Sequence, residues 1–251
     1  MLVPNYATLL VVMTALFLTA GLSVLLSYGI LKSPLVEKRR QRMAWTIGMF
    51  SALWLSTVLL ISHSNALVPE MEDVVPWLGV AIATSTLLIG MLALVPPAMR
   101  GILTAVPIGW FAGIQIYRVI GAVFLLLEAD GLLSKYFALS TAWGDIFVGV
   151  TAPIIAILLT RDARRFLWLG VTWCIIGIAD LVLVLFKAIN SAPGPRQTTA
   201  FDIPTEVVGY FPFSILPLVI VPLSIVLHLV LIQRLLAQRS RPAVGKLSET
   251  I

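Results

Sequence analysis

Seven long runs of mostly apolar residues constrain this chain more than any other feature of its sequence. A helix rises about 1.5 Å per residue, so roughly 20 apolar residues cross the ~30 Å hydrocarbon core of a bilayer. We expect membrane-spanning helices over 6–31, 43–62, 75–95, 102–127, 136–160, 166–186 and 210–232. The predicted fold class is therefore all-α, a polytopic membrane protein with one seven-helix transmembrane domain over residues 1–232.

The composition agrees with a membrane protein and excludes a soluble domain. Hydrophobic residues make up 59% of the chain, and only 12% of its residues are charged, against about 25% in soluble proteins. The single cysteine, Cys174, excludes an internal disulfide framework and a cysteine-built zinc or iron–sulfur site. The net charge of +5 is interpreted as a topology signal, and no nucleic-acid partner is expected.

The Lys and Arg residues predict the orientation of the chain. Thirteen of them lie after the first, third and fifth spans and in the tail, whereas Lys135, Lys187 and Arg196 lie on the opposite side. Because the cytoplasmic side of a membrane protein carries the excess of Lys and Arg, we expect an external N-terminus. The first span is too long for a cleaved signal peptide. Residues 233–251 are expected to form a disordered cytoplasmic tail.

Three ionisable residues lie well inside the predicted spans: Arg118, Asp145 and Asp180. Each is costly to place in a membrane, by about 2.5–3.5 kcal/mol at a helix centre. Arg118 lies nine residues before Leu127, the end of its span, and Asp145 lies nine residues after Tyr136, the start of the next span, so both are about 13 Å deep on antiparallel neighbours. We expect them to form an ion pair, and Asp180, about 9 Å deep, is placed to join it.

Further polar, aromatic and small residues lie on the same spans. The polar and aromatic residues are Gln115, Tyr117, Thr141 and Trp143. Small residues that allow close approach of helices are Gly121, Gly144 and Gly149. Two interpretations stay open. The ion pair is a structural staple, or the cluster lines an outward-facing aqueous pocket for a polar or anionic ligand or a proton. The candidate ligand-binding or proton-linked residues are Arg118, Asp145, Asp180, Gln115, Tyr117 and Trp143.

Three prolines, Pro212, Pro217 and Pro222, recur at five-residue intervals in the last span and predict an interrupted helix. His228 is expected near the cytoplasmic end of that span, and His63 near the outer end of the second. Placed so, they cannot ligate one haem or one metal ion, and no metal ligand or catalytic residue is predicted.

Several function classes receive no support from motifs. The last span has no lysine for a retinal Schiff base, and the first three spans hold no polar signature matching the last three. A paired-histidine metal motif, a G-x-S-x-G elbow and a Walker loop are also missing, so an enzyme is the least supported reading. The sequence specifies no cofactor.

Two stretches resemble an uncharacterised family of bacterial seven-span inner-membrane proteins. The resemblance rests on Gly109, Trp110, Phe111, Gln115, Tyr117, Arg118, Gly121, Phe124, Trp143, Gly144, Asp145, Gly149, Ala152, Pro153 and the stretch from Pro222 to His228 and Leu229. It implies a bacterial origin, an inner-membrane location and the seven-span layout, without supplying a mechanism.

The sequence thus favours a membrane protein that binds or transports a small polar or anionic ligand through an outward-facing pocket. The alternative is a non-catalytic sensor or an accessory subunit of a larger membrane complex, in which the ion pair is purely structural. The expected partners are the lipid bilayer, a small-molecule ligand, and a membrane-protein partner or a second copy of this chain.

Overall fold

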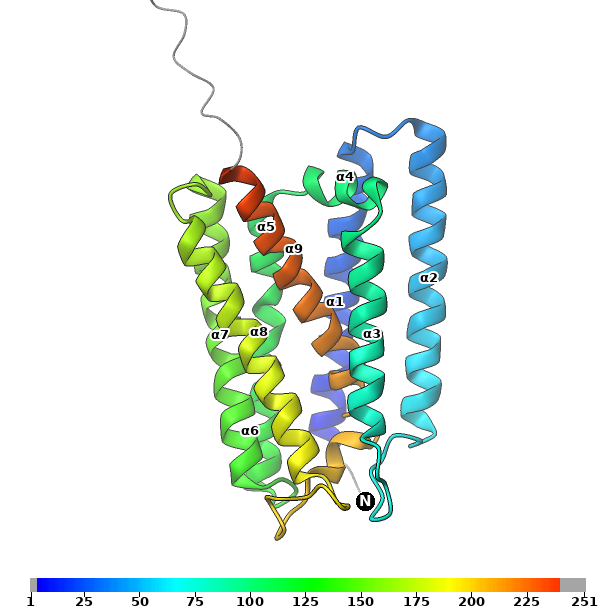
Figure 1. Ribbon diagram of the computed structural model, residues 1–251, viewed down its shortest axis with the longest axis vertical. Helices are drawn as coiled ribbons and strands as arrows, with labels where there is room; N and C mark the ends of the chain where they lie inside the picture. The colour runs from blue at the N-terminus through cyan, green and yellow to red at the C-terminus, as the bar shows by residue number, and fades with distance from the viewer. Residues whose placement is uncertain (1–3, 240–251) are drawn as a thin grey trace, which may run out of the picture.

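The computed structural model describes residues 4–239, and every regular element within that range is a helix. Seven helical segments are long and apolar enough to cross a bilayer. The all-helical fold class and the seven candidate spans are thereby confirmed. Figure 1 shows these segments running side by side as a bundle, with α2 at its edge.

The first three helices are α1 (Asn5–Lys32), α2 (Glu37–His63) and α3 (Trp77–Leu94). Their bounds follow the predicted spans except at the start of α2, which begins at Glu37, before the apolar run that starts at residue 43. The residues added at this end are mainly Lys, Arg, Glu and Gln, which are good helix formers. The helix therefore extends beyond its apolar part.

The predicted continuous helix over 102–127 is wrong. The chain instead forms α4 (Pro97–Ala105), α5 (Ile108–Gly113), the 3-10 helix η1 (Ile114–Gly121) and α6 (Ala122–Ala129). Pro107, which has no backbone N–H to donate, immediately precedes α5, as is favourable at a helix start. Consequently α4 lies across one end of the bundle, and the fourth span starts at Ile108 (Figure 1).

The remaining helices are α7 (Lys135–Asp162), α8 (Leu167–Ser191), the 3-10 helix η2 (Thr205–Gly209), the π-helix η3 (Leu216–Ile220) and α9 (Val221–Arg239). The last span therefore covers 216–239 rather than 210–232, and its π-helical turn contains Pro217. Residues 233–239, expected in the tail, are helical. The rest of that tail, residues 240–251, lies outside the described residues.

The last span forms the centre of the bundle. In its most apolar window 67% of the residues are buried, against 6% in α2. Leu231 and Leu235 of α9 are fully buried, in a core that α5, α7 and α8 also line. This arrangement places α9 beside the segments that carry the ionisable residues.

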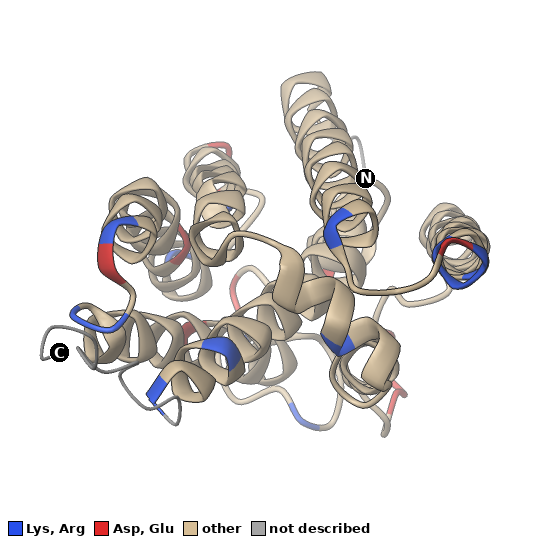
Figure 2. Cartoon of the chain, turned by 90° about the horizontal axis from the view of Figure 1, so that it is seen from above, with Lys and Arg blue, Asp and Glu red and all other residues tan. Residues whose placement is uncertain are grey.

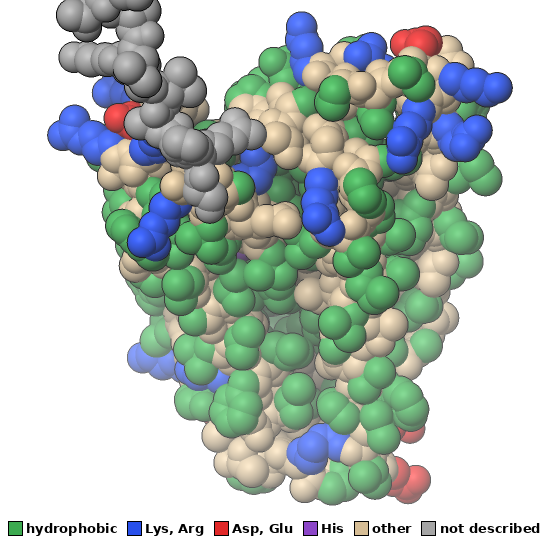
Figure 3. All heavy atoms as spheres, turned by 45° about the horizontal axis from the view of Figure 1, so that its top comes forward, with side chains coloured by type: hydrophobic (Ala, Val, Ile, Leu, Met, Phe, Trp, Pro, Cys, Tyr) green, Lys and Arg blue, Asp and Glu red, His purple; other side chains and the backbone are tan. Residues whose placement is uncertain are grey.

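The connections rich in Lys and Arg share one end of the bundle. The α1–α2 and α7–α8 connections, α4 and the C-terminal end of α9 all lie at the top of Figure 1. Lys and Arg positions are coloured along the backbone at this end in Figure 2, and their side chains stand out there in Figure 3. The structure thus brings together the groups that the alternation of spans assigned to one side.

Candidate ligand-binding site

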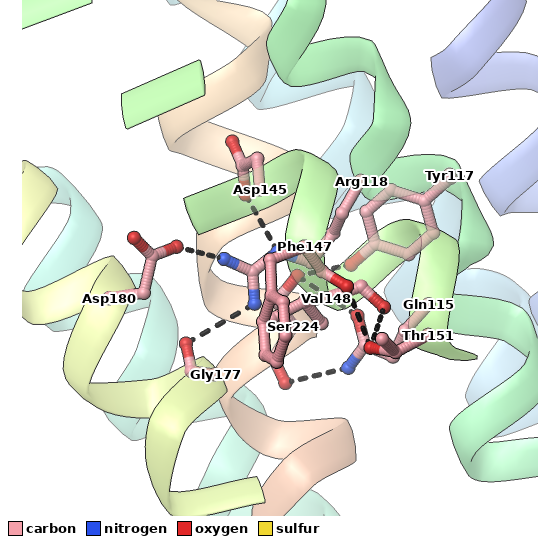
Figure 4. Close-up of polar contacts among 10 residues, drawn as sticks. All are labelled: Gln115, Tyr117, Arg118, Asp145, Phe147, Val148, Thr151, Gly177, Asp180 and Ser224. Atoms are coloured by element: carbon pink, nitrogen blue, oxygen red, sulfur yellow. Dashed lines mark hydrogen bonds and ion pairs between the residues drawn. The ribbon is translucent and has the colours of Figure 1, made fainter. Parts of the chain in front are cut away.

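Arg118 forms the centre of a buried polar cluster, as the depth of the ionisable residues predicted. Its Nε donates to Asp145 Oδ1 at 2.7 Å, and its Nη2 donates to Asp180 Oδ2 at 2.5 Å. Its Nη1 donates to the backbone carbonyl of Gly177 at 3.2 Å. Figure 4 shows the three acceptors around the guanidinium. We call Arg118, Asp145 and Asp180 the arginine cluster.

The three members of the arginine cluster come from three adjacent segments. Arg118 lies in the 3-10 helix η1, Asp145 on α7 and Asp180 on α8. Gly177 lies three residues before Asp180, so its carbonyl and the carboxylate approach Arg118 from the same helix. The cluster therefore ties together the fourth, fifth and sixth spans.

Glycines make room for the cluster where the helices meet. A Cβ added at Gly121 would overlap the Cβ of Asp145, and one added at Gly144 would overlap Oδ1 of Asp180. At Gly149 an added Cβ would lie 2.6 Å from the backbone N of Val119. The close approach of η1, α7 and α8 thus requires small residues here, as the sequence suggested.

The charge and exposure of the cluster limit what it can bind. Two carboxylates surround one guanidinium, which leaves one formal negative charge if both carboxylates are ionised. The side chain of Arg118 is 0% exposed, whereas those of Asp145 and Asp180 are 15% and 11% exposed. Arg118 is enclosed by its own acceptors, so a ligand meets a carboxylate of the cluster before the guanidinium.

A cavity of about 100 Å³ reaches the cluster from one end of the bundle. Its wall is mostly apolar. It comes from α3, η1, α6, α7, α8, η2, η3 and the first residue of α9, and from the connections 64–76 and 192–204. Asp145 and Thr141 of α7 line it, but Arg118 and Asp180 do not. We call this space the loop-end cavity. Asp145 is thus the member of the cluster that faces it.

Gln115 and Tyr117 belong to a second buried polar group. The side-chain amide of Gln115 donates to the backbone carbonyl of Ser224 at 3.2 Å, and the hydroxyls of Tyr117 and Ser224 are hydrogen-bonded to each other. These bonds join η1 to α9 and saturate polar groups within the core. The two residues therefore lie beside the cluster without lining the loop-end cavity.

The structure does not place Trp143 in the site. Its side chain is 61% exposed on the outer surface of α7. Trp143 precedes Asp145 by two residues, which corresponds to about 200° around a helix, so the two side chains point in different directions. Proximity in sequence was the wrong criterion here.

His228 is the residue that sequence reasoning misplaced. Because α9 starts late and ends late, His228 lies in the middle of the last span and is fully buried. A Cβ added at Gly177 would meet both the His228 ring and Nη1 of Arg118, so His228 borders the cluster. Among the described residues neither ring nitrogen has a hydrogen-bond partner, and the ring packs against Trp173 with centroids 5.0 Å apart.

A sequence signal for this part of the site existed. Ser224 and His228 are four residues apart and so share one face of a helix. That pair marks a polar face on an otherwise apolar span. No comparable signal identifies the Gly177 carbonyl, because a backbone acceptor has no sequence signature. Within residues 4–239, no group of three His, Cys, Asp or Glu side chains is arranged to hold a metal ion.

Comparison with known proteins gives one family match. A family model described as a domain of unknown function (DUF8737) matches residues 75–236. That range runs from just before α3 to near the end of α9 and contains the whole arginine cluster. No curated protein and no solved structure shows significant similarity to this chain.

Proposed function

Starting from the fact that the chain belongs to the family described as a domain of unknown function (DUF8737), we propose that it binds a small ligand within the membrane. The ligand occupies the loop-end cavity, and the arginine cluster links its binding to protonation. In a stronger form of the proposal, the protein also transports this ligand across the membrane.

One observation carries this proposal: Asp145 belongs both to the arginine cluster and to the cavity wall. A structural staple needs its charges paired and shielded, and it has no need of a cavity beside one carboxylate. Apolar pockets with a few polar groups are the usual form of small-molecule sites. Intramembrane carboxylates commonly mark ligand and proton pathways.

The charges of the cluster give the direction of the proton linkage. Arg118 faces Asp145 from η1, Asp180 from α8 completes the cluster, and His228 borders Arg118 from α9. Protonation of one carboxylate removes the surplus negative charge. Binding of a ligand in the cavity therefore strengthens as the pH falls, because the negative charge that faces the cavity at Asp145 disappears.

The proposal includes an orientation and a location. We place the end that carries most Lys and Arg in the cytoplasm, which leaves the N-terminus and the loop-end cavity on the outside. The protein is then a multi-pass protein of a bacterial inner membrane. The cavity lies between connections at the less basic end, so its ligand enters from outside.

Native mass spectrometry with a visible absorption spectrum tests the proposal on protein extracted in mild detergent. We compare the unmodified protein with Ala188→Phe, which fills the cavity, and with Ala179→Phe on the exposed side of α8. A small non-protein mass lost only in Ala188→Phe supports the proposal. The same mass in both variants, or a bare chain throughout, contradicts it.

The proton linkage is tested with Asp145→Asn, which replaces the carboxylate by a neutral amide. In the unmodified protein, retention of the small mass should rise as the pH is lowered. In Asp145→Asn, retention should be high and nearly independent of pH, since the surplus charge is already removed. Unchanged pH dependence in this variant contradicts a role for Asp145.

A second candidate function, an accessory subunit, is favoured by α2. This helix packs only lightly on the bundle, and Trp45, Met49, Leu53 and Leu60 are each about 70% exposed. Lipid alone can cover such a surface, and so can another membrane protein. A second polypeptide retained in the same mass spectra, and lost when α2 residues are changed, favours this candidate.

A further inference from the structure

The end of the loop-end cavity that is remote from Asp145 carries an arginine. Arg196, from the connection 192–204, lines the cavity, and its Nε is buried with no hydrogen-bond partner in the described part of the chain. Its Nη2 donates to the backbone carbonyl of Asp73 at 3.3 Å. Within residues 4–239, Arg196 forms no ion pair. A cation with a buried unused donor therefore lies at an apolar cavity.

The nearest acidic side chain on the cavity wall is already engaged. Asp73 also lines the cavity, but its Oδ2 accepts a hydrogen bond from the backbone N of Glu70 at 2.9 Å. This hydrogen bond stabilises the conformation of the connection 64–76, to which Asp73 belongs. A charged group at an apolar surface is stabilised by an opposite charge. The guanidinium of Arg196 is therefore placed to bind an anionic group of a ligand.

The backbone around Arg196 is fixed by close contact between two connections. Gly194 has a φ of +126°, and a Cβ there would lie 3.2 Å from the carbonyl oxygen of Glu70. The backbone N of Gln197 donates to the carbonyl of Gly194 at 3.0 Å, which closes a turn around Arg196. The position of the guanidinium at the cavity is therefore a consequence of packing.

The cavity is long relative to its volume. One stripe of α8 lines it at helical spacing: Leu181, Val184, Leu185, Ala188 and Ile189. From Leu181 to Ile189 the helix rises about 12 Å, yet the cavity holds only about 100 Å³. The lining therefore extends along the helix around a narrow space, and this elongated shape fits a slender chain better than a broad ring.

We propose that Arg196 is the anion-binding end of this cavity, and that the ligand is a single-chain amphiphile. Its carboxylate or phosphate group pairs with Arg196, and its unbranched hydrocarbon chain lies along α8 toward Asp145. The opposite orientation would bring the anion to the surplus negative charge of the arginine cluster. This inference rests on the proposed function, because it assigns a ligand class to the same cavity.

Titration calorimetry in nanodiscs of zwitterionic lipid tests the assignment, with empty nanodiscs as the blank. The probes are octanoate, octyl phosphate and octanol, which share a chain and differ in head group. Octanoate and octyl phosphate should bind more tightly than octanol. Arg196→Gln should weaken both anions by about tenfold to a hundredfold and leave octanol unchanged, as expected for loss of a charge-assisted hydrogen bond.

Two further variants separate charge at Arg196 from general effects. Arg196→Lys keeps the positive charge and should bind octanoate within a few-fold of the unmodified protein. Lys187→Gln removes a cation of α8 that stacks on Tyr136 and does not line the cavity, so octanoate binding should not change. Loss of octanoate binding in Lys187→Gln overturns the assignment to Arg196.

The cavity-filling variant Ala188→Phe distinguishes failure of this inference from failure of the proposed function. If Ala188→Phe abolishes binding of all three probes while Arg196→Gln leaves the preference for anions intact, the cavity is a ligand site but the anion assignment is wrong. If Ala188→Phe changes nothing, the proposed function fails as well. Competition by an anionic lysophospholipid, which has a single chain, in the nanodisc identifies the bilayer as the source of the ligand, and its absence identifies a free amphiphile.

Discussion

Arg118 is stabilised by acceptors from two helices, and its role depends on all of them together. Each of its three nitrogens donates one hydrogen bond, to Asp145, Asp180 and the Gly177 carbonyl. A buried charge is tolerated only when its partners replace the lost water. Removing the arginine would leave two carboxylates close together with no cation between them.

We expect Arg118→Met to lower the free energy of unfolding by about 3–5 kcal/mol, the usual effect of breaking a buried ion pair. Unfolding monitored in mild detergent measures this change. Combining Arg118→Met with Asp145→Asn and Asp180→Asn should restore most of the stability, since no unpaired charge remains. A single variant as stable as the unmodified protein would show that the cluster contributes no net stability.

The packing of η1, α7 and α8 depends on glycines where side chains would collide. Gly144 is the clearest case, since an added Cβ would overlap the carboxylate of Asp180. Gly48 on α2 offers a matched control, because nothing lies within 4 Å of its added Cβ. Both glycines lie inside helices, so helix propensity acts on them in the same direction.

We predict that Gly144→Ala destabilises the protein by about 1–3 kcal/mol, as overpacking does. Gly48→Ala should leave stability unchanged or raise it by up to about 1 kcal/mol through helix propensity. Thermal unfolding in detergent compares the two variants. Equal effects at both positions would contradict the packing argument.

The contact between η1 and α9 rests partly on the hydrogen bond between Tyr117 and Ser224. Tyr117→Phe and Ser224→Ala should each cost about 1 kcal/mol. Because both remove the same bond, their effects should not add, and a double-mutant cycle should give a coupling of about 0.5–1.5 kcal/mol. Tyr28→Phe, at a ring that packs on Trp110, serves as the control. Additive effects would contradict the predicted coupling.

For the molecule as a whole, the two ends differ in charge, and the orientation proposed here follows from that difference. Labelling of single cysteines tests it in a Cys174→Ala background, since Cys174 is buried. Glu72→Cys lies on an exposed connection at the less basic end, and Lys38→Cys lies near the start of α2.

We predict that a membrane-impermeant maleimide labels Glu72→Cys in intact spheroplasts and labels Lys38→Cys only after permeabilisation. The physical reason is the excess of Lys and Arg retained on the cytoplasmic side. The reverse pattern would invert the proposed orientation and place the loop-end cavity on the cytoplasmic side. Labelling of both cysteines in intact spheroplasts would contradict the proposed alternation of spans.

The amino-acid sequence alone determined the seven apolar helices and the pairing of Arg118 with Asp145 and Asp180. Both follow from properties that can be read along the chain without knowing its tertiary structure. Hydropathy and length define each span, and a fixed rise per residue gives the depth of a charged side chain. A short connection makes two spans neighbours. None of these inferences needed to know how the helices rotate about their axes.

The tertiary structure decided which residues face one another. Trp143 lies outside the cluster and His228 lies beside it because helix rotation and the true ends of α9 set their positions. The expected helix over 102–127 is interrupted before Ile108, where several shorter segments take its place. Hydropathy alone does not show that Pro107, which lacks a backbone N–H, changes the direction of the chain. The loop-end cavity and the place of Arg196 on it arise only when separate connections pack together.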